Sequence, residues 1–150
     1  MLIATWNVNS VRIRISQIVN WINQVKPEVL CLQETKVVDD DFPIEPFNKL
    51  GYEVIVYGQK SYNGVAIISK TKAENIQKGF YDFVNYDFNI ENYQDQKRLI
   101  SADFNGIKII NVYVPNGSAI ESDKFEYKIN WLSCLASFLD ELEKKGQLIC

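Results

Sequence analysis

The feature that most constrains this chain is a short apolar run that ends abruptly in a carboxylate. Residues Val29 to Gln33 read V-L-C-L-Q, and Glu34 comes directly after them. An uninterrupted apolar run of this length predicts a strand that is buried on both faces. We therefore expect Glu34 at the carboxyl end of a buried strand, the end at which open α/β sheets place their chemistry.

The segments before this run predict a βαβ unit. Leu2 to Trp6 read as a first strand, and Ser10 in the polar turn that follows is the expected N-cap of a helix. Apolar residues then recur at helical spacing until Pro27 closes the helix after about four turns. These apolar residues are Ile15, Ile18, Val19, Ile22 and Val25. Strand, helix and strand in succession indicate an α/β fold.

The rest of the chain predicts further strands and one long helix. The strands are expected at Glu53 to Tyr57, Gly64 to Ser69, Leu99 to Phe104 and Ile107 to Val114. The Asn105-Gly106 pair between the last two is a strong hairpin signal. Apolar residues at helical spacing from Phe125 to Leu142 predict a helix that ends at Gly146. Leu148 to Cys150 then resembles the start of another buried strand, from which we expect the chain to be truncated.

Two stretches read as irregular surface. The triplet Asp39-Asp40-Asp41 is expected to be a solvated loop, and calcium is the weaker alternative because the glycine and closing glutamate of a calcium loop are missing. Residues 71–97 carry a group of aromatic side chains, Phe80, Tyr81, Phe83, Tyr86, Phe88 and Tyr93. Stacking on nucleic-acid bases is one role for them. Only Lys78 and Lys97 lie nearby, however, so packing under a loop is favoured.

Composition narrows the class of protein. The chain has 150 residues, 47% of them hydrophobic, enough for one domain or for a piece of a larger one. We expect a cytoplasmic protein, because no stretch is apolar enough to span a membrane and the start lacks the features of a signal peptide. Cys31, Cys134 and Cys150 read as reduced core cysteines. A net charge of −3 argues against binding nucleic acid by bulk charge, so any contact with phosphate must come from a few basic residues or a bound cation.

Oxygen ligands follow two of the expected strands. If those strands are neighbours, Asn7 and Glu34 bring an amide oxygen beside a carboxylate, which is a small site for a hard cation such as Mg²⁺. From spacing alone, an asparagine that shapes a turn and a solvated glutamate are the more common explanations.

A third candidate residue is Tyr113. Pro115 cannot donate to a central ladder, so it ends the strand and leaves Tyr113 and Asn116 at the mouth of the sheet. A phenol with a pKa near about 10 is protonated at neutral pH and can donate to a phosphate oxygen. The alternative is a tyrosine that only packs at the rim of the sheet.

Several motifs then occur in a characteristic order and spacing. They are Thr5-Trp6-Asn7-Val8-Asn9-Ser10, Leu32-Gln33-Glu34-Thr35-Lys36, Gly58-Gln59-Lys60, Asn63-Gly64-Val65-Ala66, Arg98, Tyr113-Val114-Pro115-Asn116-Gly117 and Lys124-Phe125. Together they closely resemble the exonuclease III family of AP endonucleases, within the DNase I-like endonuclease, exonuclease and phosphatase superfamily. The resemblance implies an α/β sandwich of two packed sheets flanked by helices. Residues 1–150 would be the N-terminal portion, about the first half, of a single domain of this kind.

The resemblance also implies roles for individual residues. Glu34 matches the metal-binding glutamate, Asn7 the asparagine that helps to hold the metal and its water, and Tyr113 the tyrosine that contacts the scissile phosphate. The positions implied for binding DNA phosphate, or lining the site, are Arg98, Asn116 and Lys124, and more weakly Gln59, Lys60 and Lys128. The implied cofactor is Mg²⁺, with Mn²⁺ as the alternative.

Other groups of the family have no counterpart in this sequence. A G-D-x-N motif is expected after the strand that begins at Leu148, and an aspartate and a histidine are expected further on. The 150 residues contain no histidine, so we expect this chain alone to lack its general base and to be inactive. Asp87-Phe88-Asn89 and Asp103-Phe104-Asn105 are similar in sequence, but both precede Tyr113 and cannot be the missing motif.

The function implied is that of an exodeoxyribonuclease III or AP endonuclease. Such a hydrolase cleaves phosphodiester bonds of duplex DNA from 3′ ends and at abasic sites during base excision repair, and we expect a monomer when it is intact. One alternative is a phosphatase or phosphodiesterase of the same superfamily that acts on a small or lipid phosphate. The other is a non-catalytic fragment that binds nucleic acid.

Overall fold

The first half of the chain builds one four-stranded sheet with its helices. In the computed structural model, residues 1–80, 93 and 96–150 are described. The elements of this half are β1 (Ile3–Asn7), α1 (Val11–Val25), β2 (Val29–Gln33), η1 (Asp39–Asp41), α2 (Glu45–Asn48), β3 (Glu53–Tyr57) and β4 (Val65–Ser69). The strand order is β1-β2-β4-β3, in which β1 and β2 are parallel and the other pairs antiparallel. The expected βαβ unit is present.

The second half builds another four-stranded sheet. Its elements are β5 (Glu74–Lys78), β6 (Leu99–Phe104), β7 (Ile107–Val112), α4 (Asp123–Lys144) and β8 (Leu148–Ile149). The order is β5-β6-β7-β8, and only β7 and β8 run parallel. Asn105 and Gly106 both have a positive φ and form the tight turn of the β6–β7 hairpin, as the sequence predicts.

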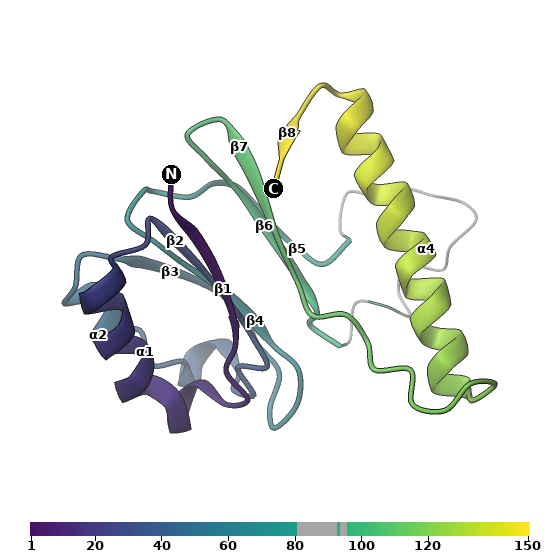
Figure 1. Cartoon of the computed structure of the whole chain (residues 1–150), viewed down its shortest axis with the longest axis horizontal. Coiled ribbons are helices and arrows are strands. Elements are labelled where there is room, and N and C mark those ends of the chain that lie inside the picture. The colour runs from purple at the N-terminus through teal and green to yellow at the C-terminus, as the bar shows by residue number, and fades with distance from the viewer. Residues whose placement is uncertain (81–92, 94–95) are drawn as a thin grey trace.

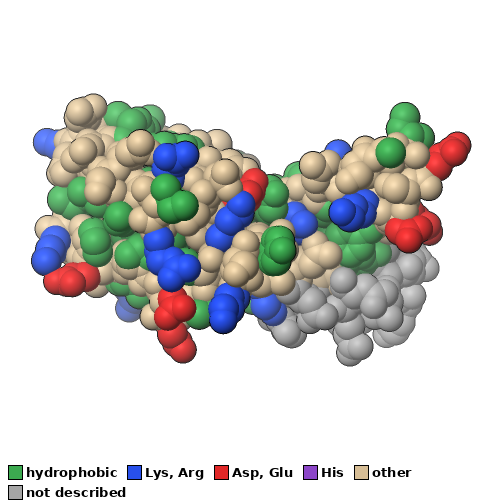
Figure 2. Space-filling view, turned by 90° about the horizontal axis from the view of Figure 1, so that it is seen from below, with side chains coloured by type: hydrophobic (Ala, Val, Ile, Leu, Met, Phe, Trp, Pro, Cys, Tyr) green, Lys and Arg blue, Asp and Glu red, His purple; other side chains and the backbone are tan. Residues whose placement is uncertain are grey.

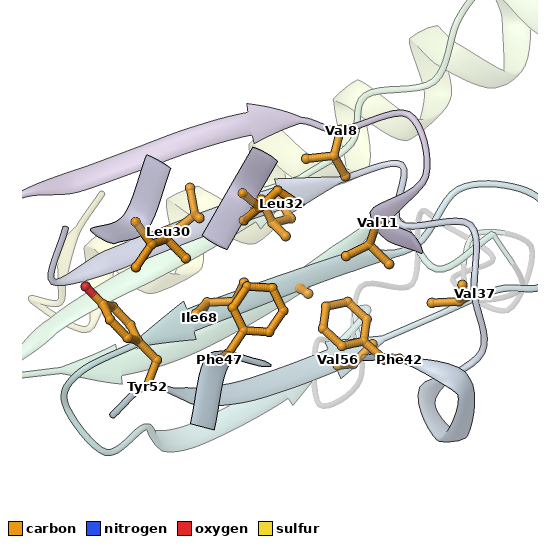
Figure 3. Packing of buried hydrophobic residues seen from close by; sticks show 13 residues of the cluster. Val8, Val11, Leu30, Leu32, Val37, Phe42, Phe47, Tyr52, Val56 and Ile68 are labelled. Carbon is orange, nitrogen blue, oxygen red and sulfur yellow. The ribbon is translucent and has the colours of Figure 1, made fainter. Parts of the chain in front are cut away.

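The two sheets pack against each other, and helices cover their outer faces (Figure 1). Val29, Cys31 and Ile67 of the first sheet meet Ile100 and Phe104 of the second in a cluster between the sheets. On the outer face of the first sheet, Leu30, Leu32 and Ile68 pack with residues of α1 and α2, among them Val11 and Phe47 (Figure 3). Helix α4 covers the second sheet through Trp131, Cys134, Phe138 and Leu142.

These layers explain why β2 and β4 are buried at every position. Each strand has a helix layer on one side and the other sheet on the opposite side, so both of its faces must be apolar. The two-sheet sandwich with flanking helices, expected from the sequence, is confirmed.

The start of α1 differs from the expectation. Ser10 does precede the helix, but its side chain makes no capping hydrogen bond, and its φ is +94°. Backbone carbonyls of another segment accept hydrogen bonds from the helix start instead. The amide of Ser10 donates to the carbonyl of Glu34 at 2.7 Å, and the amide of Val11 donates to that of Thr35 at 3.1 Å. The helix start is therefore tied to the segment that follows β2, which satisfies amides that have no partner inside the helix.

Several boundaries and burial states also differ. β7 ends at Val112, two residues earlier than expected, while the short helix α2 and the strand β5 were not expected at all. Asp39 to Asp41 form one turn of 3₁₀ helix within the irregular segment. Cys31 and Cys134 are buried as expected, but Cys150 is exposed, because β8 is short and ends beside only one neighbouring strand.

The aromatic group of residues 71–97 can be assessed in part. Phe80 is buried and makes an edge contact with Trp131 of α4, while Tyr93 meets Tyr127 of the same helix. These two residues pack as expected. Tyr81, Phe83, Tyr86 and Phe88, together with the look-alike Asp87-Phe88-Asn89, lie outside the described residues. No helix in the described part of the chain is both long and apolar enough to cross a lipid bilayer.

Candidate active site

Three strands from the two sheets finish at the same end of the molecule (Figure 1). Asn7 is the last residue of β1, Glu34 directly follows β2, and Tyr113 directly follows β7. Because β1 and β2 are parallel neighbours with Asn7 opposite Gln33, the ends of the two strands are adjacent. The expectation that Asn7 and Glu34 lie side by side is confirmed.

The chain turns sharply after β2. Glu34 and Lys36 have φ values of +54° and +57°, in the left-handed region that side chains rarely adopt. The intervening segment is held by the neighbouring loop, since the amides of Thr35 and Lys36 donate to the carbonyls of Gly64 and Asn63 at 3.1 and 3.0 Å. This strained turn aims the Glu34 side chain across the ends of the strands.

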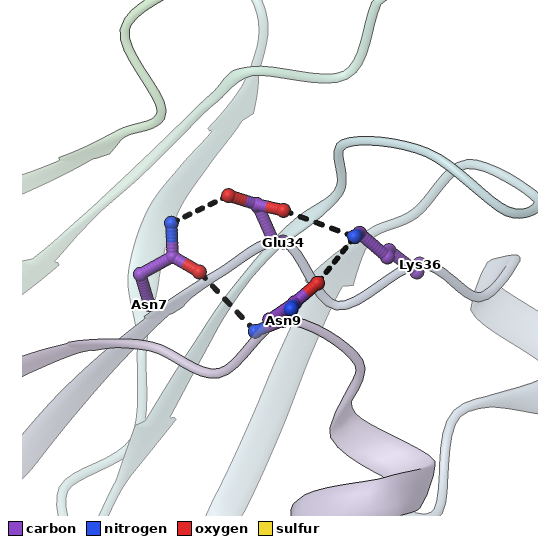
Figure 4. Close-up of polar contacts among 4 residues, drawn as sticks. All are labelled: Asn7, Asn9, Glu34 and Lys36. Carbon is purple, nitrogen blue, oxygen red and sulfur yellow. Dashed lines mark hydrogen bonds and ion pairs between the residues drawn. The ribbon is translucent and has the colours of Figure 1, made fainter.

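Four side chains form a polar ring at this point (Figure 4). The Asn7 amide nitrogen donates to Glu34 Oε1 at 2.7 Å, and Lys36 Nζ lies 3.1 Å from Glu34 Oε2. Lys36 also donates to Asn9 Oδ1, and the Asn9 backbone amide donates to Asn7 Oδ1 at 3.2 Å. The Glu34 carboxylate is therefore held at both oxygens.

Hydrogen bonds decide the protonation of the pair Glu34 and Tyr113. Partial burial acts to raise the pKa of Glu34, but hydrogen bonds from Asn7, Lys36 and Tyr113 outweigh it and lower the pKa below its ordinary value. Partial burial, together with the hydrogen bond to Glu34, raises the pKa of Tyr113. Glu34 is therefore an anion and Tyr113 a neutral donor at neutral pH.

The oxygen atoms of this polar ring include ligands suited to a hard cation. Carboxylate and amide oxygens are the ligands that Mg²⁺ takes, and the Lys36 ammonium group already lies against oxygens of Glu34 and Asn9. The Asn7 amide presents its nitrogen to Glu34, so it would have to turn to become a ligand. The described residues contain no cluster of three His, Cys, Asp or Glu side chains suited to a metal. Glu34 can thus provide the carboxylate of one wall of a metal site.

A pocket of about 450 Å³ lies next to Arg98, the residue that contacts the Tyr113 ring. Its lining includes Arg98, Asn116 and Lys124, so the structure brings together the three residues implied to bind phosphate. Arg98 is fixed by its neighbours. Its Nε donates to Gln96 Oε1 at 2.7 Å, its Nη1 donates to the carbonyl of Tyr113 at 3.1 Å, and its guanidinium group lies over the Tyr113 ring.

The three weaker candidates lie outside this pocket. Gln59 accepts a hydrogen bond from Asn63 at 2.8 Å, within the loop that supports the Glu34 turn, and Lys60 is exposed on the same loop. Lys128 lies against Gly117, one helical turn beyond Lys124. Seen from the end where β1, β2 and β7 finish, Lys and Arg side chains spread across the middle of the surface, beside a hollow (Figure 2).

Sequence reasoning assigned no role to Asn9 and Lys36, although both lie inside the quoted motifs. Their contacts depend on positive φ angles at Asn9, Glu34 and Lys36, which no periodicity reveals. Gln33 and Asn111 were also missed. Both are buried polar residues between the sheets, and a polar residue at the end of an otherwise apolar strand was the available signal.

Two mixed sheets packed face to face and flanked by helices, with polar side chains at the strand ends, define the DNase I-like class of fold. The chain belongs to the endonuclease/exonuclease/phosphatase family, whose family model matches residues 4–142.

Individual relatives agree with this assignment. Exodeoxyribonuclease III of Haemophilus influenzae is 34% identical over 154 residues, which cover 99% of this chain and 55% of that protein. The structure of an AP endonuclease from Archaeoglobus fulgidus matches with a TM-score of 0.84 and 42% identity, over 94% of this chain and 52% of that one. A 3′ phosphatase from Neisseria, bound to a product DNA hairpin, matches with a TM-score of 0.85 and 38% identity, over 95% and 53%. The chain spans about half the length of the curated relatives it matches.

Proposed function

We propose that this chain forms part of a divalent-metal-dependent nuclease that hydrolyses phosphodiester bonds of duplex DNA at 3′ ends and abasic sites. The observation that carries the proposal is the Glu34 carboxylate, held by Asn7 and Lys36 at the ends of β1 and β2, together with the pocket lined by Arg98, Asn116 and Lys124. Its relatives include an exodeoxyribonuclease III and an AP endonuclease. Base excision repair is the process such an activity would serve.

Each residue of the site would have its own role in binding the metal or the phosphate. Glu34, with Asn7 at its side, would hold Mg²⁺ or Mn²⁺, which when bound neutralises phosphate charge. Tyr113, kept protonated, would donate its hydroxyl proton in a hydrogen bond to an oxygen of the scissile phosphate. Arg98 and Lys124 would bind a neighbouring phosphate of the backbone. The cytoplasmic location and the monomeric state stay predictions from the sequence.

The experiment is cleavage of an end-labelled duplex with one abasic site by the full gene product. We expect Mg²⁺-dependent incision, and we expect Glu34→Gln to lower the rate by more than about 100-fold, the upper end of the loss that follows removal of a second-sphere partner of a metal. Glu45→Gln, on the exposed surface and paired only with Lys49, is the matched control and should cleave normally. Unchanged metal dependence in Glu34→Gln would exclude Glu34 as the ligand.

The rival function is a phosphatase of the same family that acts on a small or lipid phosphate. Both functions need Glu34, so the discriminating residues are Arg98, Asn116 and Lys124, which line the pocket and would contact further phosphates of a DNA backbone. Under the nuclease proposal, Lys124→Ala weakens binding of duplex DNA and spares hydrolysis of a small aryl phosphate. Hydrolysis of the small ester that duplex DNA fails to inhibit would favour the phosphatase.

A further inference from the structure

A buried polar network joins the two sheets directly beneath the candidate site. Gln33 at the end of β2 is 8% exposed, and Asn111 of β7 is 2% exposed. The Gln33 amide nitrogen donates to Asn111 Oδ1 at 2.7 Å and to Thr5 Oγ1 of β1 at 2.9 Å. Asn111 Nδ2 in turn donates to the carbonyls of Leu32 and Ala66, both at 2.9 Å. One point thus connects β1, β2 and β4 of the first sheet to β7 of the second.

The chemistry of the partners fixes how these amides are oriented. Backbone carbonyls only accept hydrogen bonds, so Asn111 must turn its nitrogen toward Leu32 and Ala66 and its oxygen toward Gln33. Gln33 must then offer its own nitrogen to that oxygen. If either amide flipped, its oxygen would face another buried acceptor oxygen without a hydrogen bond, which costs free energy. The network therefore specifies a single register between the sheets.

Each member of the network lies close in sequence to a residue of the site. Thr5 is two residues before Asn7 on β1, and Asn111 is two residues before Tyr113. Alternate residues of a strand project to the same side, so Asn7 and Tyr113 point the same way as Thr5 and Asn111. Gln33 directly precedes Glu34. A shift of β7 against β2 would carry Tyr113 away from Glu34.

We infer that Gln33 and Asn111 are positioning residues, which lock β7 to β1 and β2 and so hold Tyr113 beside Glu34 at the ends of these strands. This inference deepens the proposed function and rests on it for its biological meaning. The position of Tyr113 relative to Glu34 is a property of the folded chain and can be measured without metal or DNA. Failure of DNA cleavage and failure of the positioning role are therefore separate results.

The test follows the Tyr113 ring in NMR spectra of the chain labelled with ¹³Cζ-tyrosine, with the signal assigned by Tyr113→Phe. Glu34→Gln replaces the charged acceptor of the phenol, so it should shift the Tyr113 signal. In a Gln33→Met background the length of the side chain is kept but the donor is removed, and we expect this response to be lost. Thr5→Val removes only the hydrogen bond from Gln33 to Thr5. Because Thr5 is exposed, we expect this variant to fold and its response to be weakened.

The matched control is Ile109→Val, which trims a buried side chain on the same face of β7 and leaves the network intact. The Tyr113 response to Glu34→Gln should persist there in full. A full response in both Gln33→Met and Thr5→Val would overturn the inference, and so would an equal loss in Ile109→Val. If Gln33→Met does not fold, Thr5→Val decides by the same criterion.

Discussion

The position of the Glu34 carboxylate depends on the backbone conformation around it as much as on the hydrogen bonds of its side chain. The positive φ angles at Glu34 and Lys36 turn the chain out of β2, and the loop that ends at Gly64 holds that turn through two backbone hydrogen bonds. Motif resemblance could identify Glu34, Asn7 and Tyr113 as candidates from the sequence. It could not show that Lys36 and Asn9 complete a ring with Glu34 and Asn7, because that ring depends on local left-handed conformations.

Gly64 offers a test of this support at the level of one residue. Its φ is +84°, and a Cβ atom there would collide with the buried Thr35 hydroxyl, directly behind Glu34. Gly106 has a similar φ of +81° but open space around it, which makes it a matched control. We expect Gly106→Ala to lose only the conformational term of about 1–2 kcal/mol, and Gly64→Ala to lose more. Urea denaturation measures both, and equal losses would show that the close approach to Thr35 carries no energy.

At the level of elements, the long apolar segments were predictable and the polar ones were not. β2 and β4 have an apolar side chain at nearly every position, which only a doubly covered strand explains. β5 reads E-N-I-Q-K, and its first three residues are exposed at the edge of a sheet, so its hydrophobic pattern is too weak to predict a strand. The four residues of α2, with Pro46 among them, lack a helical period for the same reason.

β5 pairs with β6 and is also held by a polar cluster around Asp103. The Asp103 carboxylate pairs with Lys108 at 2.8 Å and accepts hydrogen bonds from Asn75 at 2.7 Å and Gln147 at 3.1 Å. The side chains of Asp103 and Lys108 are only 13% and 7% exposed. This one carboxylate therefore joins β5, β6, β7 and the segment before β8.

The cluster should make the stability of the second sheet depend on pH. Burial alone would raise the pKa of Asp103, but Lys108, Asn75 and Gln147 outweigh it and lower the pKa. Because the folded value lies below the unfolded value of about 3.9, the stabilisation is present above that pH and is lost as the pH falls through the folded pKa. We expect Asp103→Asn to cost about 3–5 kcal/mol at neutral pH, since it leaves Lys108 buried and unpaired, and to flatten the acid side of the profile.

The control for Asp103 is Glu45→Gln, which removes an exposed pair and should leave the acid profile as it is. The measurement is the denaturation midpoint at a series of pH values from about 2.5 to 7, the range in which the stabilisation by Asp103 should be lost. An acid limb that is just as steep in Asp103→Asn would assign the pH dependence to other carboxylates.

At the scale of the whole molecule, the sandwich followed from the order of elements and the resemblance together. The resemblance supplied what the periodicity could not, namely that strands of one sheet face strands of the other. The register between the sheets could not be predicted, because it depends on a hydrogen bond between Gln33 and Asn111, which are 78 residues apart in sequence.

The composition of the whole chain leads to an expectation about its activity. The chain has no histidine, and the candidate site brings one carboxylate, Glu34, to the position of a metal ligand. Hydrolysis of a phosphodiester also needs a base for the attacking water, and Glu34, held at both oxygens by Asn7 and Lys36, would already serve the metal. We expect the purified 150-residue chain to give no Mg²⁺-dependent incision of an abasic duplex above background. Incision at the rate of a full-length relative measured alongside would show that these residues suffice.

The division of the chain into two consecutive sheets has a consequence for how the protein is made. Every strand of the first sheet has been synthesised once residue 69 is added, whereas β7 begins only at residue 107. Because chains fold from the N-terminus during synthesis, the first sheet can form while Gln33 and the carbonyls of Leu32 and Ala66 still face water. Once Asn111 has been added, it can close the network between the sheets, so we expect the candidate site to be assembled late in synthesis.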